Sequence, residues 1–68
     1  MTRADVERIV RSVIRDYAVP STIWRITLLS RDWNIELVDA TGGRTTLTVA
    51  DSSPQYLRSS VMAALELD

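Results

Sequence analysis

The sequence predicts an α+β domain in which a three-stranded antiparallel β-meander has one helix before it and one after it, in the order α-β-β-β-α. Residues 23–50 alternate between apolar and polar side chains at the period of a strand, and turn residues interrupt this alternation twice. The segments on either side repeat apolar residues at helical spacing. Because each element has one apolar face, we expect both helices to pack on the same face of the sheet.

The first helix is predicted over Arg3–Tyr17. Thr2 is a suitable N-cap, and Asp5, three residues later, places negative charge in the first turn. The apolar side that follows at helical spacing comprises Val6, Ile9, Val10, Val13, Ile14 and Tyr17. The opposite side is charged, and it includes an arginine stripe formed by Arg8, Arg11 and Arg15.

In each of the three predicted strands, the alternation places one row of residues on the side that faces the core. These rows are Trp24, Ile26 and Leu28, then Trp33, Ile35 and Leu37, then Thr45, Leu47 and Val49. Aligning the rows puts Leu28 opposite Ile35 and Leu37 opposite Leu47. The first turn then lies around Arg31-Asp32, and 41–43 form a three-residue loop with a glycine for its left-handed position. We expect both tryptophans to pack in the core; the alternative is a stacking platform for a base or sugar.

The second helix begins in the segment Asp51-Ser52-Ser53-Pro54. Either Ser53 is the N-cap, with Pro54 at the first helical position, or Ser52 is the N-cap and Gln55 completes a capping box. The residues expected to face the core are Leu57, Val61, Ala64 and Leu65.

The composition limits the chemistry that the chain can perform. Its 68 residues allow one small domain, spanning 1–68, with a net charge of −1. Cysteine and histidine are absent and all eight basic residues are arginine, which removes the usual nucleophiles, general bases and metal ligands. The carboxylates of Asp32, Glu36 and Asp39 follow strand geometry and are not expected to converge. We therefore expect no enzyme activity, no cofactor and no metal site.

The sequence also gives an expectation of the cellular location of the protein. No apolar run approaches the roughly 20 residues that a membrane-spanning helix needs. The first residues lead directly into the amphipathic pattern, and no secretory signal is recognisable. We expect a cytoplasmic protein with no membrane partner.

The predicted order of elements resembles the double-stranded-RNA-binding-domain-like fold. The resemblance covers the whole chain as topology and implies a meander backed on one face by both helices. In that family RNA is contacted by the first helix, by a Gly-Pro-x-His-like loop after the first strand and by a Lys-rich start of the second helix. The corresponding segments here are Ser30-Arg31-Asp32 and 53–58, and neither matches. The resemblance thus carries over no RNA-contact residue.

The outer face of the predicted sheet is flat, threonine-rich and partly apolar. Its candidate interface residues are Arg25, Thr27, Leu29, Glu36, Val38, Thr46 and Thr48. The leading hypothesis is a small non-enzymatic protein-interaction or self-association module, whose partner is an unknown protein or a second copy in a homodimer. If the chain self-associates, we expect this face to be buried. The alternative is a nucleic-acid-binding domain that uses the arginine stripe, although the net charge does not favour a nucleic-acid partner.

Overall fold

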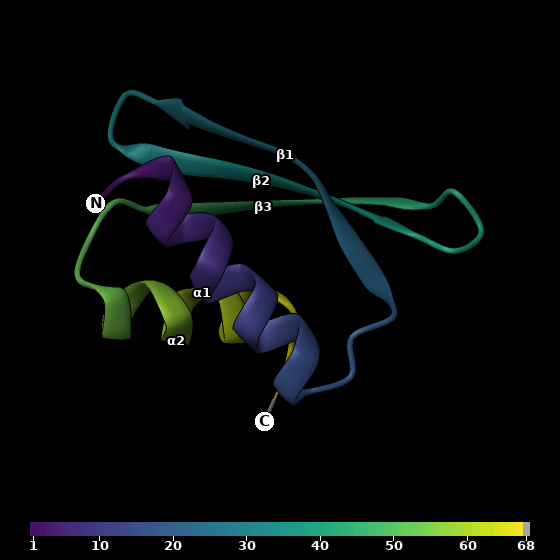
Figure 1. Ribbon diagram of the computed structural model, residues 1–68. Coiled ribbons are helices and arrows are strands. Elements are labelled where there is room, and N and C mark those ends of the chain that lie inside the picture. The colour runs from purple at the N-terminus through teal and green to yellow at the C-terminus, as the bar shows by residue number, and fades with distance from the viewer. Residues whose placement is uncertain (68) are drawn as a thin grey trace.

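The computed structural model describes residues 1–67 and has the predicted α-β-β-β-α order. The strands form one antiparallel sheet in the order β1-β2-β3, and both helices lie beneath the same face of it (Figure 1). α1 packs mainly against β1, α2 packs against β3, and the two helices touch each other. The predicted fold class is confirmed. The elements are α1 (Arg3–Asp16), β1 (Ser21–Leu29), β2 (Asp32–Asp39), β3 (Arg44–Ala50) and α2 (Pro54–Ala64).

α1 begins with a complete capping box. The hydroxyl of Thr2 accepts a hydrogen bond from the Asp5 amide at 3.2 Å, and the Asp5 carboxylate accepts one from the Thr2 amide at 3.0 Å. Such caps stabilise a helix by about 1 kcal/mol. The helix ends at Asp16, one residue earlier than predicted, because Tyr17 is its C-cap. Three valines on its apolar side are fully buried: Val6, Val10 and Val13.

α2 uses the first of the two caps considered. Ser53 is the N-cap and its hydroxyl accepts from the Tyr56 amide at 3.3 Å, while Pro54 occupies the first turn. Leu57 and Val61 are fully buried, as predicted. Ala64 is exposed instead, since it lies at the last residue of the helix.

The core lies between the inner face of the sheet and the two helices. Its strand residues are Ile26, Trp33, Ile35, Leu37, Leu47 and Val49. Trp33 is only 3% exposed, and its indole Nε1–H donates to Asp51 Oδ1 at 2.9 Å. The predicted core position of Trp33 is therefore confirmed, with a polar partner supplied for its N–H.

The predicted pairing of β2 with β3 is wrong by two residues. Leu37 lies opposite Thr45, and Ile35 takes the place opposite Leu47. The loop still has three residues, but it comprises 40–42, and Gly42 adopts the left-handed conformation with φ of 85°. Because a shift by two returns every side chain to its own face, the predicted faces survive on these strands.

The side chain of Asp39 explains the position of this loop. Its Oδ1 accepts hydrogen bonds from the Thr41 amide at 2.9 Å, the Thr41 hydroxyl at 2.7 Å and the Gly43 amide at 2.8 Å. These contacts close the hairpin at Asp39 and Gly43, one residue earlier than expected. They also lower the pKa of Asp39, the Thr41 hydroxyl having the largest effect.

The predicted pairing of β1 with β2 is also wrong by two residues near the first turn. Leu28 lies opposite Trp33 rather than Ile35, and Ser30-Arg31 form a two-residue turn. Ser30 has a φ of 57°, as the tight hairpin turn requires at its first residue.

A β-bulge further along β1 overturns the predicted position of Trp24. Ile23 lies opposite Leu37 and Arg25 lies opposite Glu36, so Trp24 is an extra residue on β1. Ile23 packs against the core in its place, and Trp24 is 54% exposed. A bulge re-aims side chains in this way because two residues of one strand oppose one residue of the other.

Candidate protein-interaction surface

The outer sheet face, opposite the helices, gathers all seven residues predicted for an interface. Their positions follow from the pairing: Arg25 with Glu36 and Thr46, Thr27 with Asn34 and Thr48, Val38 with Thr22 and Arg44, and Leu29 with Asp32 and Ala50. No helix covers this face in the part of the chain that the structure describes (Figure 1). The sequence therefore placed these residues on the correct side, although their neighbours across the strands differ from the prediction.

Trp24 and Arg44 add a feature to the outer sheet face that sequence reasoning missed. The guanidinium carbon of Arg44 lies 4.9 Å from the centre of the Trp24 ring. A cation–π contact of this kind contributes about 0.5–1 kcal/mol at an exposed site, and it links a residue of β1 to a residue of β3. Strand periodicity could not reveal it, because the bulge breaks the alternation at Trp24 itself.

The remaining charges at the centre of the face largely neutralise each other. Arg25 Nε lies 3.6 Å from Glu36 Oε2, with side chains 64% and 25% exposed. The Thr48 hydroxyl is 3.4 Å from the side-chain oxygen of Asn34. Exposed ion pairs contribute little to stability, so we assign this pair a role in surface charge balance.

Two carboxylates of β2 are engaged in local contacts. The Asp39 carboxylate is occupied by the hairpin loop, and that of Glu36 is paired with Arg25. Among residues 1–67, no group of three carboxylate, histidine or cysteine side chains is placed to hold a metal ion.

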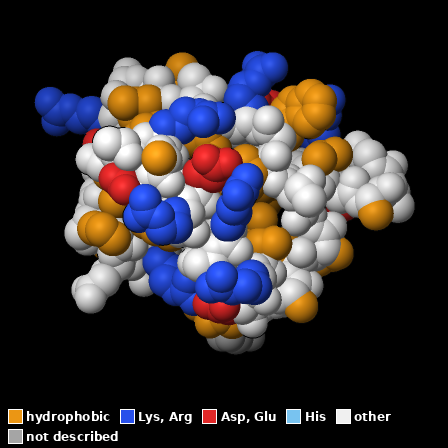
Figure 2. Space-filling view, in the orientation of Figure 1, with side chains coloured by type: hydrophobic (Ala, Val, Ile, Leu, Met, Phe, Trp, Pro, Cys, Tyr) orange, Lys and Arg blue, Asp and Glu red, His pale blue; other side chains and the backbone are white. Residues whose placement is uncertain are grey.

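The arginine stripe on α1 is the second candidate surface, and each of its members has an acid beside it. Arg8 lies 3.5 Å from Asp5, and Arg11 lies 3.1 Å from Glu7. Arg15 likewise contacts Asp16, at 3.3 Å. Figure 2 shows the outcome on this side of the molecule, where basic and acidic side chains are interspersed.

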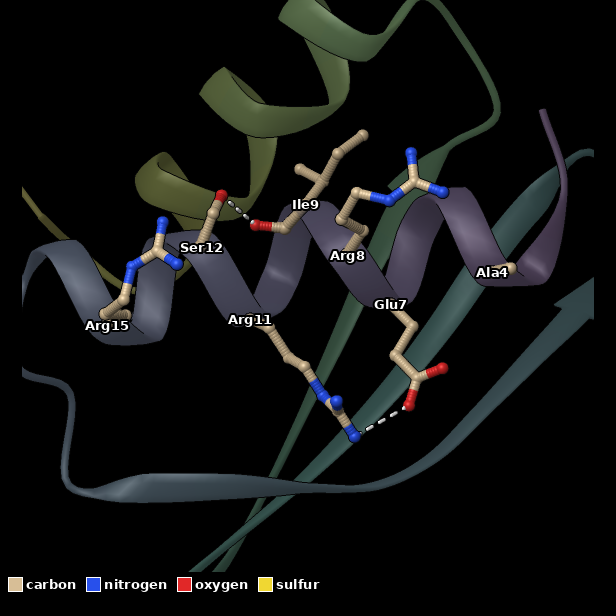
Figure 3. Close-up of a pocket in the computed structure, with 7 residues that line it drawn as sticks. All are labelled: Ala4, Glu7, Arg8, Ile9, Arg11, Ser12 and Arg15. Atoms are coloured by element: carbon tan, nitrogen blue, oxygen red, sulfur yellow. Dashed lines mark hydrogen bonds and ion pairs between the residues drawn. The ribbon is translucent and has the colours of Figure 1, made fainter.

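A shallow depression follows the same side of α1 (Figure 3). Arg11 bends toward Glu7 within it, and the hydroxyl of Ser12 donates to the carbonyl of Ile9 at 2.7 Å. The residues that line it are Ala4, Glu7, Arg8, Ile9, Arg11, Ser12 and Arg15. All of them come from one helix, so the depression is a feature of side-chain packing along α1 rather than a cleft between elements.

Arg58, the basic residue of α2, faces α1. It donates to the hydroxyl of Ser12 at 2.7 Å and to Asp16 Oδ2 at 3.1 Å. The pKa of Asp16 is lowered, first by its hydrogen bond with Arg15 and then by that with Arg58. Arg58 therefore joins the two helices through its contacts with Ser12 and Asp16.

The fold and its surfaces define a small α+β domain whose topology is compatible with the double-stranded-RNA-binding-domain-like arrangement. Comparison with protein-family models, with curated proteins and with solved structures found no match. Within the described residues, neither helix has the length and apolar character needed to cross a membrane.

Proposed function

We propose that this chain is a non-enzymatic protein-interaction module that self-associates through the outer sheet face. The observation that carries the proposal is an exposed aromatic on an uncovered sheet face: Trp24, at the bulge of β1, is 54% exposed and lies against Arg44. Leu29, on the same face, is 57% exposed. Tryptophan and arginine are enriched at the centres of protein interfaces, where they supply a large contact area.

A second copy is the partner that the charges favour. Arg25 and Glu36 are neighbours of opposite sign near the middle of the face. A two-fold contact can therefore place Arg25 of one copy beside Glu36 of the other without opposing like charges. Val38 and the threonines around this pair offer a flat surface that can stack on its own copy.

Sedimentation equilibrium of the full chain tests the proposal. Val38→Glu places a charge on the outer sheet face and should convert a dimer to a monomer without altering the far-ultraviolet circular dichroism spectrum. Ala40→Glu is the matched control, since Ala40 is exposed in the β2–β3 loop and outside the face. A wild-type chain that stays monomeric at millimolar concentration would overturn the proposal, as would a dimer that survives Val38→Glu.

Nucleic-acid binding through the arginine stripe is the less supported alternative, because an acid lies within 3.5 Å of each stripe residue. We expect no complex with an RNA duplex of about 20 base pairs tighter than on the order of tens of micromolar at physiological salt. A tight complex that Arg8→Ala or Arg11→Ala weakens would favour the alternative over the proposed function.

A further inference from the structure

The two edges of the sheet differ in how they are protected. On the β1 edge, the side chain of Arg3 donates from Nε to the carbonyl of Ile26 at 3.2 Å. The bulge at Trp24 interrupts the same strand. The bulge and the occupied carbonyl both lie within β1 and interrupt the row of backbone groups with which another strand would pair, so the β1 edge is protected.

The β3 edge presents unpaired backbone groups along its middle, whereas at its end the Ala50 carbonyl accepts a hydrogen bond from the Ser52 hydroxyl at 3.3 Å. The Asp39 amide donates to the Gly43 carbonyl at 2.9 Å, and the Asp51 amide donates to the Arg31 carbonyl at 2.8 Å. Antiparallel pairs alternate between bonded and non-bonded positions, so the odd-numbered residues of β3 bond to β2. The backbone groups of Thr46 and Thr48 consequently point away from the sheet.

β3 also lacks a bulge, a proline and a central charge, which usually prevent an edge strand from pairing with a strand of another chain. Its pairing with β2 runs without a register shift from Arg44 to Ala50, and it contains no proline. Its one charged residue, Arg44, stands at the first position and lies over Trp24. Edge strands of seven residues without a bulge, a proline or a central charge are competent to pair with another chain.

The side of α2 that faces away from α1 is free of charge as well. Arg58, the one charged residue between Pro54 and Ala64, reaches toward α1. At 100° per residue, the opposite side carries the residues that we call the α2 flank: Tyr56, Ser60 and Ala63. Because α1 lies against β1 and α2 against β3, the α2 flank and the β3 edge are on the same side of the molecule.

We propose that a second copy of the chain pairs with the β3 edge, antiparallel and about a two-fold axis, to form a continuous six-stranded sheet. With the axis at Leu47, Thr46 of each copy lies opposite Thr48 of the other, and Arg44 lies opposite Ala50. Cross-strand threonine pairs are favourable, and no like charges face each other. This inference goes beyond the proposed function because it uses a different surface from the outer sheet face.

A second copy fits this side of the molecule better than an isolated extended peptide does. A peptide covers the strand edge alone, whereas a second copy brings its own α2 flank against the first. Small side chains at Ser60 and Ala63 allow the two helices to approach to about 8–10 Å. A seven-residue strand is about 24 Å long, and a sheet with one helix layer is about 20 Å deep, so the contact covers roughly 480 Å² per copy. For two copies the total is about 960 Å², which is below the roughly 1,200 Å² of stable interfaces and typical of a weak, transient one.

Two variants test the pairing by sedimentation equilibrium from micromolar to millimolar concentration. Thr48→Pro removes an outward-pointing amide, a change that an edge strand tolerates within the monomer. Tyr56→Glu puts a charge on the α2 flank, and at the third helical position after Ser53 it completes a capping box, so the monomer should not lose stability. Both should at least halve the associated fraction; because Thr48 also lies on the outer sheet face, Tyr56→Glu is the variant that distinguishes the two surfaces. Gln55→Glu adds the same charge in the same turn but outside the α2 flank, and it should associate as the wild type does.

The outcomes separate the two proposed surfaces. Association that is lost in Tyr56→Glu and kept in Val38→Glu supports the β3 edge and overturns the outer-face interface. The reverse pattern overturns the β3 edge and leaves the outer sheet face in place. A wild-type tetramer that each variant reduces to a dimer supports both surfaces. A wild-type monomer at millimolar concentration, or equal effects of Tyr56→Glu and Gln55→Glu, overturns the pairing at β3.

Discussion

Replacing Asp51 by alanine should destabilise the domain through the core tryptophan. The carboxylate of Asp51 accepts the hydrogen bond of the Trp33 indole at 2.9 Å, and Trp33 is 3% exposed. Asp51→Ala leaves this N–H without its partner. A lost hydrogen bond to a charged acceptor costs about 1.5–3 kcal/mol, and the exposure of Asp51 favours the lower value. For a domain of this size, a loss of about 1.5 kcal/mol lowers the melting temperature by roughly 6–12 °C.

The Asp51→Asn variant is the matched control for this prediction. Its amide oxygen still accepts from Trp33, and the backbone bond from the residue-51 amide to Arg31 is retained in both variants. Thermal unfolding followed by circular dichroism should therefore place Asp51→Asn close to the wild type. Either an unchanged melting temperature in Asp51→Ala or an equal loss in both variants would refute the role assigned to this hydrogen bond.

Three further predictions concern stability. Leu37 is 1% exposed in the central strand, so Leu37→Ala should cost about 2–5 kcal/mol in a denaturant titration, and a smaller loss would contradict its core position. Gly42 has a φ of 85°, so Gly42→Ala should cost about 1–2 kcal/mol although no atom obstructs its side chain; an unchanged midpoint would contradict the strained loop. The pKa values of Asp5, Asp16 and Asp39 are lowered in the folded state. The ionised carboxylates therefore stabilise the fold fully above the pKa of the unfolded state, about 3.9, and this stabilisation is lost as pH falls through their lower pKa values in the folded state. The free energy of unfolding should be level above about pH 5 and decline below pH 4; a rise on acidification would show that the sign is wrong.

The helices and the assignment of most faces could be predicted because both depend on local patterns. A capping residue and a 3.6-residue apolar repeat identify a helix wherever it packs. The buried valines of α1 and the cap at Ser53 show this directly. Face assignment on β2 and β3 also survived, since an error of two residues in pairing preserves the side on which each residue lies.

The strand pairing could not be predicted as well, because it depends on turn side chains rather than on apolar rows. Aligning the leucines of β2 and β3 predicts a register that pairs Leu37 with Leu47. In the structure, the hydrogen bonds of Asp39 with Thr41 and Gly43 instead favour the register shifted by two residues. The sequence carried a signal for this choice. An aspartate before a glycine-containing loop commonly bonds the backbone two residues later, and this can fix where the loop begins.

Among the errors of prediction, the missed bulge in β1 has the largest consequence for function. One extra residue between Ile23 and Arg25 moves an indole ring from the predicted core to the outer sheet face, and it also interrupts the β1 edge. Burial of Trp24 would have gained hydrophobic energy, so the fold gives up core packing at this position and obtains an exposed aromatic beside Arg44. Departures from local pattern of this kind concentrate at functional sites. Trp24 thus interrupts the β1 edge and also adds an exposed aromatic ring to the outer sheet face. The β3 edge is then the edge at which we propose that a further strand pairs.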